Sequence, residues 1–569
     1  MADSKTWRRL HPRKGNDGKR RGGVLRPLLW GSALLYICLT AIVRALVPPP
    51  QAIGLQGAQY NAEFLRFHHD DSWLDEFGNR HLSQELFDEV FTMIGQAETF
   101  ILLDMFLFNA WQGPVPESHR ALSTELTDAL IAQKKRYPSM RIILITDPIN
   151  TVYGGLRSPH IENLRNAQIN VVLTDLSRLQ DSNPAWSGFW RLAISPFGNS
   201  ESQLLPNPFG QGRVSLRSYL ALFNFKANHR KLLVADHAGE TLHAYVGSAN
   251  PHDGSSAHRN VGVSFSGPAV LDLLDGEREL LKMSSADSAW RTLDEWQAEW
   301  FRSGEPESNP MPAAGAGEAA ILAGSPRVQV LSESRIHDAV LAALEQAGSG
   351  DAIALAMFYL SDRQIIQSLK AASSRGASVR VMLDVNTDAF GRQKNGVPNR
   401  PVAAELVSAG MQVRWCATTG EQCHAKWLHV SLGSDPGSAP DFVPASRRAS
   451  TRARPSTSMP AKLLAKPAER TPASIRDDDP ARAAGEHVFV LGSANFTRRN
   501  LLDLNMETSV LIRTAHDDVL ADEMIEFFDD QWNNRDGRIY TRDYAEHADD
   551  SLLLTLQYRL MEWSGLSTF

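Results

Sequence analysis

The sequence predicts an α/β fold of two pseudo-symmetric lobes with mixed sheets and one shared active site, preceded by a transmembrane helix. Short β-rich apolar runs alternate with helical patterns, and the same order of elements recurs in the second half. One apolar stretch near the N-terminus is about as long as a helix that crosses a bilayer. A chain of 569 residues, with 43% hydrophobic and 22% charged residues, has the size and composition of a multidomain globular protein.

The N-terminal segment, residues 1–50, combines a basic leader with an apolar stretch. Residues 1–26 contain nine basic and two acidic residues, a charge of +7, so the net charge of −7 leaves −14 for the rest of the chain. The stretch Leu28–Val47 is long enough to cross ~30 Å of hydrocarbon, and Arg44 can reach the interface. Because few cations follow, we expect a single-pass protein with a cytoplasmic N-terminus and its body on the periplasmic face of a bacterial inner membrane.

Three other interpretations of this segment stay open. A cleaved signal peptide usually has a shorter apolar region, and here Pro48-Pro49-Pro50 follows directly. The pair Arg20-Arg21 weakly resembles a twin-arginine signal. A buried core helix is the third interpretation, which the charged leader disfavours.

The first predicted lobe, residues 51–302, alternates strands and helices. We expect helices at 83–96, 118–136 and 268–283, and strands at 99–108, 141–147, 169–174, 231–236, 242–247 and 261–265. An insertion at about 178–215 contains Trp186, Trp190 and Phe209. These aromatic side chains are expected either in an ordinary core or in a lipid-facing lid.

The second predicted lobe, residues 325–540, repeats this order of elements. We expect helices at 336–347, 362–374, 402–409 and 516–531, and strands at 351–360, 377–384, 411–416, 424–430, 487–491 and 508–513. Recurrence of the whole series indicates an internal duplication.

Three further segments lie outside the regular pattern. Residues 303–324 are rich in Pro, Gly, Ala and Glu and are expected to be a linker between the lobes. Residues 433–486 are rich in Pro, Ser, Ala and Arg and are expected to be a disordered insertion, either a solvated loop or a contact to anionic lipids. The tail, residues 541–569, is expected to form a helix at Leu552–Trp563 that packs on the body rather than on a membrane.

The residues that carry chemistry occur twice in the same order. Each half contains a His-x-Lys motif followed by Gly-Ser-Ala-Asn, and the residues are His229, Lys231, Ser248 and Asn250 in the first half and His424, Lys426, Ser493 and Asn495 in the second. A single His-x-Lys is a weak signal. Two copies at matching places of a duplicated α/β unit are a strong one.

This spacing suits phosphoryl chemistry. In an extended segment residues i and i+2 face the same side, so the His and Lys of each motif point at one phosphate. A neutral imidazole attacks phosphorus while a second, protonated imidazole donates to the leaving oxygen. The two lysines and two asparagines then stabilise charge on the nonbridging oxygens. The chemistry requires neither a metal nor a cofactor.

On these motifs the chain resembles the phospholipase D superfamily over roughly residues 85–535, with the bacterial phospholipase D and cardiolipin synthase-like branch as the nearest match. The resemblance implies one active site between two lobes and a covalent phosphohistidine, with His229 as nucleophile and His424 as acid and then base. It also implies catalytic roles for Asp236 and Glu507. Arg259 and Arg498, together with Ser248 and Ser493, are candidates for substrate binding.

The chain departs from the family pattern in two places. Ser431 stands where the second motif is expected to place its Asp. The family's downstream acid is Glu507 in the second half, whereas the matching segment Asn260-Val261-Gly262 has glycine. Because a carboxylate supports a cationic imidazole, the roles of the two histidines stay open to reversal, and Asp253 is a candidate substitute acid.

Several other residues have two interpretations. Cys416 and Cys423 either close a small loop beside the second motif in an oxidising compartment or remain thiols. The run from His68 to Asp71 is expected in a solvated loop rather than in a metal site. His252 and His258 are expected either to line the pocket or to be structural.

The leading prediction of function is a lipid-active enzyme that hydrolyses phospholipids or transfers phosphatidyl groups, with a phospholipid and an alcohol or water as its partners. The negative body disfavours a nucleic-acid partner, because nonspecific affinity for nucleic acid depends on Lys and Arg. Two alternatives stay open: a nuclease acting on single-stranded nucleic acid through the same site, and a noncatalytic membrane scaffold.

Overall fold

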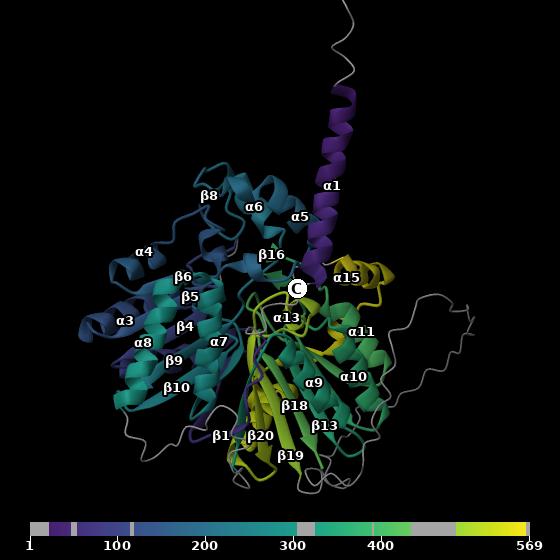
Figure 1. Ribbon diagram of the computed structural model, residues 1–569. Coiled ribbons are helices and arrows are strands. Elements are labelled where there is room, and N and C mark those ends of the chain that lie inside the picture. Colours follow the sequence, from purple (N-terminus) through teal and green to yellow (C-terminus); the bar gives the residue numbers. More distant parts are fainter. Residues whose placement is uncertain are drawn as a thin grey trace, which may run out of the picture.

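Two large β-sheets, each with helices on its outer side, form the body of the protein in the computed structural model (Figure 1). The structure describes residues 22–46, 54–113, 119–303, 325–389, 392–433 and 485–564. The predicted linker 303–324 and insertion 433–486 lie outside these residues except at their ends. The predicted α/β class with two mixed sheets is confirmed.

The first sheet has eight strands in the order β3-β2-β11-β10-β9-β4-β5-β6. Its strands are β2 (Leu65–Leu74), β3 (Arg80–Ser83), β4 (Phe100–Met105), β5 (Arg141–Thr146), β6 (Asn170–Leu173), β9 (Lys231–His237), β10 (Thr241–Gly247) and β11 (Asn260–Ser266). The accompanying helices are α2 (Leu86–Gln96), α3 (Leu122–Arg136), α4 (Pro159–Asn166), α5 (Pro184–Ala193), α6 (Leu216–Leu222), α7 (Ala269–Met283) and α8 (Asp287–Ser303). A small hairpin pairs β7 (Leu205–Pro206) with β8 (Arg213–Val214).

The second sheet has nine strands in the order β1-β12-β20-β19-β18-β13-β14-β17-β21. Its strands are β1 (Tyr60–Asn61), β12 (Arg327–Ser332), β13 (Ala352–Met357), β14 (Ser378–Leu383), β17 (Gln412–Cys416), β18 (Lys426–Leu432), β19 (Glu486–Gly492), β20 (Thr508–Ala515) and β21 (Thr541–Asp543). The accompanying helices are α9 (Ser334–Gln346), α10 (Arg363–Ser374), α11 (Asn399–Ser408), α13 (Arg498–Leu501), α14 (Val519–Asn533) and α15 (Leu552–Ser564). A second hairpin pairs β15 (Asp388–Ala389) with β16 (Arg392–Gln393).

The two sheets repeat one topology. The order β2-β11-β10-β9-β4-β5-β6 of the first sheet matches β12-β20-β19-β18-β13-β14-β17 of the second. In both, the strand that carries the His-x-Lys lysine, β9 or β18, runs antiparallel to the first strand of a parallel group, β4 or β13. This repetition places the two motifs at equivalent positions.

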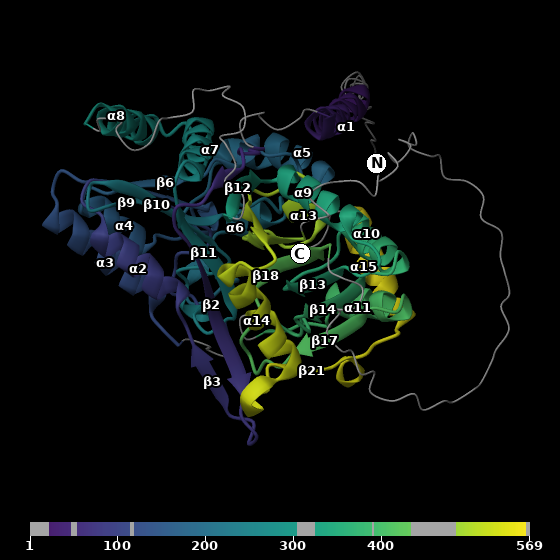
Figure 2. The ribbon, with the colours of Figure 1, turned by 90° about the horizontal axis from the view of Figure 1, so that it is seen from below.

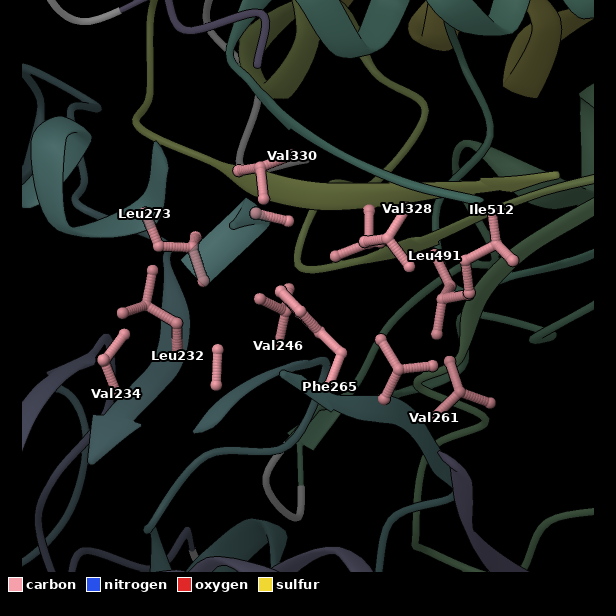
Figure 3. Packing of buried hydrophobic residues seen from close by; sticks show 14 of the residues in the cluster. Leu232, Val234, Val246, Val261, Phe265, Leu273, Val328, Val330, Leu491 and Ile512 are labelled. Carbon is pink, nitrogen blue, oxygen red and sulfur yellow. The ribbon is translucent and has the colours of Figure 1, made fainter. Parts of the chain in front are cut away.

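The inner faces of the sheets pack on one another. Figure 3 shows side chains of both sheets meeting in one hydrophobic cluster, among them Val246, Val261 and Phe265 from the first sheet and Leu491 and Ile512 from the second. Each fully buried side chain of this size stabilises the fold by roughly 1.5–3 kcal/mol. The lobes are therefore held by a shared core, which fixes one motif relative to the other.

Amphipathic helices complete each lobe. Helices α2 and α3 bury apolar side chains against β4, β5 and β9, and α9, α10 and α11 do the same against β13, β14 and β18. Figure 2 shows α14 beside β2 and the second sheet, and its Gln531 donates to Asp71 of β2 at 2.8 Å. Helix α14 therefore connects the lobes from one side.

The N-terminal helix α1 (Gly22–Leu46) lies beside α5 at one end of the molecule (Figure 1). Across the described part of the chain, none of the helices has both the length and the apolar character needed to cross a membrane. The predicted span Leu28–Val47 is therefore a helix over most of its length, but the structure does not show it as a membrane span.

The C-terminal helix α15 packs on the second lobe through the buried Tyr558, whose hydroxyl donates to the carbonyl of Ser361 at 2.9 Å, and through Leu554, Met561 and Glu562. The apolar side chains of α15 that point to solvent are Leu552, Leu553, Leu556, Leu560 and Trp563. The predicted helical tail thus contacts the body with a narrow face and leaves a wide apolar face exposed.

Candidate active site

The two His-x-Lys motifs lie at the starts of β9 and β18, close to one another. The backbone of each motif is hydrogen-bonded to the opposite lobe. The backbone N–H of His229 donates to the carbonyl of Met506 at 2.8 Å, and that of His424 donates to the carbonyl of Arg259, also at 2.8 Å. Each motif thus pairs with the segment that precedes the other lobe's strand, β20 or β11. This exchange brings both histidines to one place.

Side chains from both motifs line a single pocket of about 590 Å³. His229, His424, Asn250 and Asn495 all contribute to its wall. His252 and His258, which were expected either to line the pocket or to be structural, both line the same cavity. Lobe one and lobe two therefore share this cavity.

His229 is hydrogen-bonded to a carboxylate of the other lobe. Its Nδ1 lies 3.0 Å from Oε2 of Glu507, which also accepts hydrogen bonds from Ser493 and Asn500. Burial lowers the pKa of His229 to about 4, although the negative charge of Glu507 opposes the shift. With its proton on Nδ1 facing Glu507, the ring presents an unprotonated Nε2, which is the form that attacks phosphorus.

His424 is hydrogen-bonded to a neutral amide instead. Its Nδ1 lies 3.0 Å from Oδ1 of Asn260, which also accepts from Ser248 Oγ at 3.1 Å. Burial and the nearby charge of Lys426 hold the pKa of His424 well below its ordinary value. The two imidazoles are thus supported differently, one by a carboxylate and one by an amide.

The counterpart of Glu507 is Asn260, and the expectation that Gly262 matches it is wrong by two residues. Ser248 N donates to the carbonyl of Val261, and Ser493 N donates to that of Thr508, both at 2.9 Å, which aligns Asn260 with Glu507. Gly262 lies inside β11, where an added Cβ would come within 2.8 Å of the Tyr245 ring. Close packing against Tyr245 therefore explains why residue 262 is glycine, and this position is not the counterpart of the acid Glu507.

The two motif lysines are buried beside the histidines. Lys231 Nζ donates to the carbonyl of His229 at 2.6 Å, and Lys426 Nζ donates to that of His424 at 2.7 Å. Burial lowers the pKa of Lys231 to about 7, and burial together with repulsion from Lys231 holds that of Lys426 well below its ordinary value. Two crowded ammonium groups favour the binding of an anion, which would raise both pKa values.

Each histidine and lysine pair also packs on a phenylalanine. The ring of Phe106 lies 4.7 Å from that of His229 and 5.1 Å from Lys231 Nζ. Phe358 takes the same position at 5.0 Å from His424 and 5.2 Å from Lys426 Nζ. Sequence reasoning missed both rings, although each lies near the end of a predicted strand and directly follows the observed strand, β4 or β13.

Two buried aspartates that sequence reasoning also missed hold the backbone before each motif. Asp147 Oδ2 accepts from Asn228 N at 2.7 Å, and Asp384 Oδ2 accepts from Cys423 N at 2.8 Å. Both directly follow a buried parallel strand, β5 or β14. The sequence has an Asp at the end of each of these two equivalent strands, and this repeated Asp was the signal that could have identified the pair.

The predicted catalytic role of Asp236 is wrong. It lies five residues after Lys231, near the far end of β9, where its carboxylate accepts from the backbone N–H groups of Glu98, Thr99, Phe100 and Gly239. At about 3.3 Å per residue, the strand separates it from Lys231 by roughly 17 Å. In lobe two Ser431 stands at this place, and the carboxylate of Asp351 accepts from Gly433 N and Gly348 N.

The four residues predicted to bind substrate make contacts with other protein groups. Ser248 and Ser493 contact Asn260 and Glu507, so they support the histidine partners rather than a substrate. Arg259 is buried between the lobes and donates to Ser72, Tyr540 and Ala417. Arg498 is exposed and donates to the carbonyl of Glu562 at 3.3 Å. Asp253, the candidate substitute acid, accepts from Ser123 at the start of α3.

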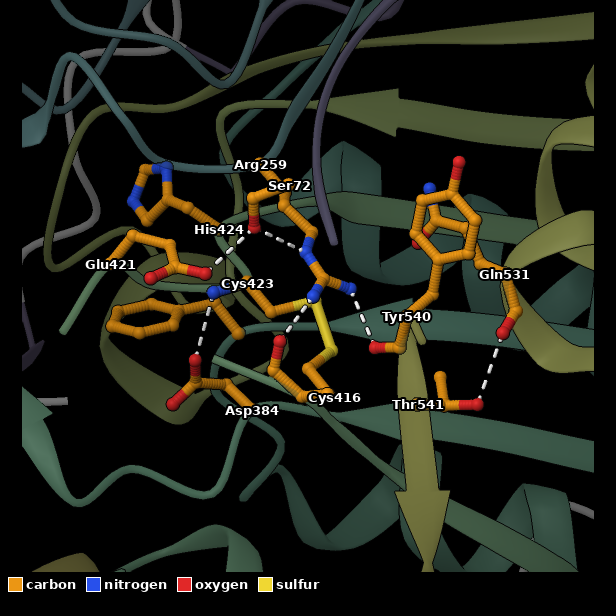
Figure 4. The surroundings of a disulfide bond; sticks show 12 residues. Ser72, Arg259, Asp384, Cys416, Glu421, Cys423, His424, Gln531, Tyr540 and Thr541 are labelled. Carbon is orange, nitrogen blue, oxygen red and sulfur yellow. Dashed lines mark hydrogen bonds between the residues drawn. A yellow bond between two sulfur atoms is a disulfide. The ribbon is translucent and has the colours of Figure 1, made fainter. Parts of the chain in front are cut away.

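Cys416 and Cys423 form a disulfide next to the second motif (Figure 4). Figure 4 shows Arg259 beside this bond and Asp384 facing Cys423. The disulfide joins the end of β17 to the residue before His424. Of the two interpretations of these cysteines, the structure shows the paired one.

The run His68–Asp71 is part of β2 and not a loop. Successive side chains of a strand point to opposite faces, so His68 contacts Ser264 whereas His69 contacts Asp71 and Phe527. Within the described residues, no three His, Cys, Asp or Glu side chains are arranged to hold a metal ion.

A buried arginine between the two motif residues ties the lobes together. Arg230 donates to Glu277 of α7 and to Glu333 of the second lobe, each at 2.7 Å. Glu333 also accepts from the backbone N–H of Glu507 at 3.1 Å. The position of Glu507 beside His229 therefore depends on this charged cluster.

Replacing Glu507 with glutamine is expected to lower kcat by about 10²-fold, within the range that positioned acid–base groups contribute. The amide keeps the shape of the side chain but removes the charge that supports His229 as it becomes bonded to phosphorus. The measurement is kcat on a soluble phosphodiester. A kcat within twofold of the wild type would show that the carboxylate does not support His229.

The chain is similar to one protein family and to several solved structures. The family described as cardiolipin synthase, PLD-like domain, matches residues 340–532, which include the second His-x-Lys and the second Gly-Ser-Ala-Asn. No curated protein matches the sequence. The phosphatidylserine synthase of Haemophilus influenzae Rd KW20 is similar at 10% identity, with a TM-score of 0.46 over 90% of this chain and 96% of that one. The phospholipase D family member Nuc of Salmonella typhimurium is similar at 20% identity, with a TM-score of 0.23 over 39% of this chain and 99% of that one.

Proposed function

We propose that this chain is a member of the phospholipase D superfamily, which the match of residues 340–532 to the cardiolipin synthase, PLD-like domain family supports, and that it transfers the phosphatidyl group of a phospholipid to an alcohol or to water through a phosphohistidine at His229. The observation that carries the proposal is the hydrogen bond between His229 and Glu507 in a pocket shared with His424. Among the two histidines, only His229 has a carboxylate partner. This arrangement favours His229 as the nucleophile.

The first step forms the covalent intermediate. Nε2 of His229 attacks phosphorus, the new P–N bond forms, and the bond from phosphorus to the head-group oxygen breaks. Protonated His424 gives its proton to that leaving oxygen. The anionic phosphodiester between the rings favours the protonated form of His424, which burial and the charge of Lys426 disfavour.

The second step releases the phosphatidyl group. A water or alcohol oxygen attacks phosphorus, His424 accepts its proton, and the P–N bond breaks to restore the imidazole of His229. Lys231 and Lys426 stabilise the charge on the nonbridging oxygens in both steps. The side chains of Asn250 and Asn495 line the same pocket and supply further amide groups.

The apolar character of the pocket supports a lipid substrate. Its wall includes the apolar side chains of Phe106, Leu107, Ile149, Phe209, Leu222 and Phe225. Phe209, Leu222 and Phe225 come from the stretch between β6 and β9, which also exposes large apolar side chains at Phe189, Phe197 and Leu204. Exposed apolar patches of this kind mark contacts with lipid or protein partners.

We also propose that the body works at a membrane surface outside the cytoplasm, with the N-terminal segment as its attachment. The basic leader and the exposed Trp30, Leu34 and Leu35 of α1 support this. The disulfide beside His424 supports an oxidising compartment.

The test is an assay of the purified full chain in detergent with phosphatidylglycerol and added glycerol, resolved by lipid mass spectrometry. We expect cardiolipin or phosphatidic acid from the wild type and neither from His229→Ala or His424→Ala. Unchanged phospholipid, together with histidine-dependent cleavage of single-stranded DNA, would replace the proposal with a nuclease. No reaction on either substrate would point to a noncatalytic scaffold.

A further inference from the structure

Two cations outside the His-x-Lys motifs line the pocket wall of the second lobe. Arg499 belongs to α13, next to the exposed Arg498, and Lys394 follows the β15–β16 hairpin. The guanidinium carbon of Arg499 lies 4.9 Å from the ring centroid of Phe225 in the first lobe. Lys394 Nζ lies 2.8 Å from the hydroxyl of Tyr359. Both charges therefore face the cavity that contains the histidines.

The guanidinium of Arg499 has no carboxylate within 4 Å among the residues that the structure describes. Other largely buried arginines are compensated, since Arg230 contacts two glutamates and Arg259 donates to three oxygens. Burial lowers the pKa of Arg499 to about 10, although the charge of Glu562 opposes this. Burying a cation without an acceptor is unfavourable, and a bound anion removes the cost.

Neighbouring residues link both cations to the catalytic histidines. Asn500, the residue after Arg499, donates to Glu507, which is the partner of His229. Tyr359, the partner of Lys394, follows Phe358, whose ring lies 5.0 Å from that of His424. The motif lysines surround the reacting phosphate, so these two cations are left for a second negative group.

We propose that Arg499 and Lys394 form a second anion subsite, which binds the phosphodiester of an anionic phospholipid that acts as the acceptor. This inference rests on the proposed phosphatidyl transfer. A free hydroxyl on the acceptor head group attacks the phosphorus of phosphohistidine, His424 accepts its proton, and the P–N bond to His229 breaks. The subsite thereby favours an anionic lipid over an uncharged alcohol or water as the acceptor.

The experiment measures a ratio of two products of one enzyme. Phosphatidylcholine is the donor, phosphatidylglycerol and ethanol compete as acceptors, and the two transfer products are quantified together. We expect the phosphatidylglycerol-to-ethanol ratio to fall about tenfold in Arg499→Gln and about threefold in Lys394→Gln, as for the loss of charge-assisted hydrogen bonds. Because both products come from the same folded molecules, the ratio does not depend on how much of a variant folds.

Arg498→Gln is the matched control, because it removes the adjacent arginine from the exposed surface, and its ratio is expected to equal that of the wild type. An unchanged ratio in both Arg499→Gln and Lys394→Gln would overturn the subsite, as would an equal fall in Arg498→Gln. If equimolar inorganic phosphate lowers the wild-type ratio to that of the variants, the subsite binds free phosphate and the proposal is wrong. Absence of both products in the wild type would instead overturn the proposed function.

Discussion

His424→Ala is expected to stop turnover and to leave one phosphorylated histidine per chain when the substrate is a phosphodiester with a nitrophenolate leaving group. That leaving group needs no proton, so His229 attacks and releases one equivalent of nitrophenolate. Without His424, no base activates water, and the P–N bond persists. Peptide mass spectrometry under alkaline conditions identifies the modified residue, and a rapid burst followed by almost no steady-state rate is the kinetic sign.

His229→Ala is the reciprocal variant and is expected to give no burst and a kcat at least about 10⁴-fold below the wild type, as for the loss of a nucleophile. The structural reason for this order is that Glu507 supports His229, whereas Asn260 offers His424 only a neutral amide. Phosphate found on His424 in the His229→Ala protein would reverse the two roles. The same experiment therefore decides the assignment that the sequence left open.

Arg230→Met is expected to lower the free energy of unfolding by about 3 to 5 kcal/mol, because it leaves Glu277 and Glu333 buried without their cation. Urea unfolding followed by tryptophan fluorescence measures the change. Activity is expected to fall as well, since Glu333 holds the backbone N–H of Glu507.

Arg141→Met is the control for this prediction. Arg141 also makes two hydrogen bonds to one glutamate, Glu299, but that glutamate is exposed, so the pair is expected to contribute little to stability. Adding Glu277→Gln and Glu333→Gln to Arg230→Met is expected to recover part of the loss, because the unpaired charges are then removed. Similar effects of Arg230→Met and Arg141→Met would show that burial of the cluster contributes nothing.

Much of the fold follows from sequence patterns that are local. The buried run Phe100–Met105 and the run Arg141–Thr146 are strands as predicted, because continuous apolar residues bounded by polar ones are typical of parallel strands. The predicted helix at 516–531 is observed at Val519–Asn533. The repeated order of elements was also visible, and the matching strand orders of the two sheets agree with it.

The parts of the site that were not predicted depend on contacts between the lobes. Asp236 follows its motif in the sequence. Only the folded strand shows that its carboxylate lies at the far end of β9, where it accepts from Phe100 N, and not at the pocket. Arg259 follows a Gly-Ser-Ala-Asn motif, but only the packed structure shows that three oxygens of other segments surround it. Glu507 was predicted to be a catalytic acid, but its pairing with His229 was not predicted. A sequence does not show which residues of the two lobes face each other.

The exchange of partners between lobes also sets the time at which the site first exists. Glu507 lies 278 residues after His229. At about 5–20 residues per second, a ribosome needs roughly 14 to 56 seconds to add that stretch. During this interval the first lobe carries its histidine and lysine without the carboxylate that supports them. Synthesis of the second lobe thus imposes a delay, and the proposed active site is complete only after residue 507 has been added to the growing chain.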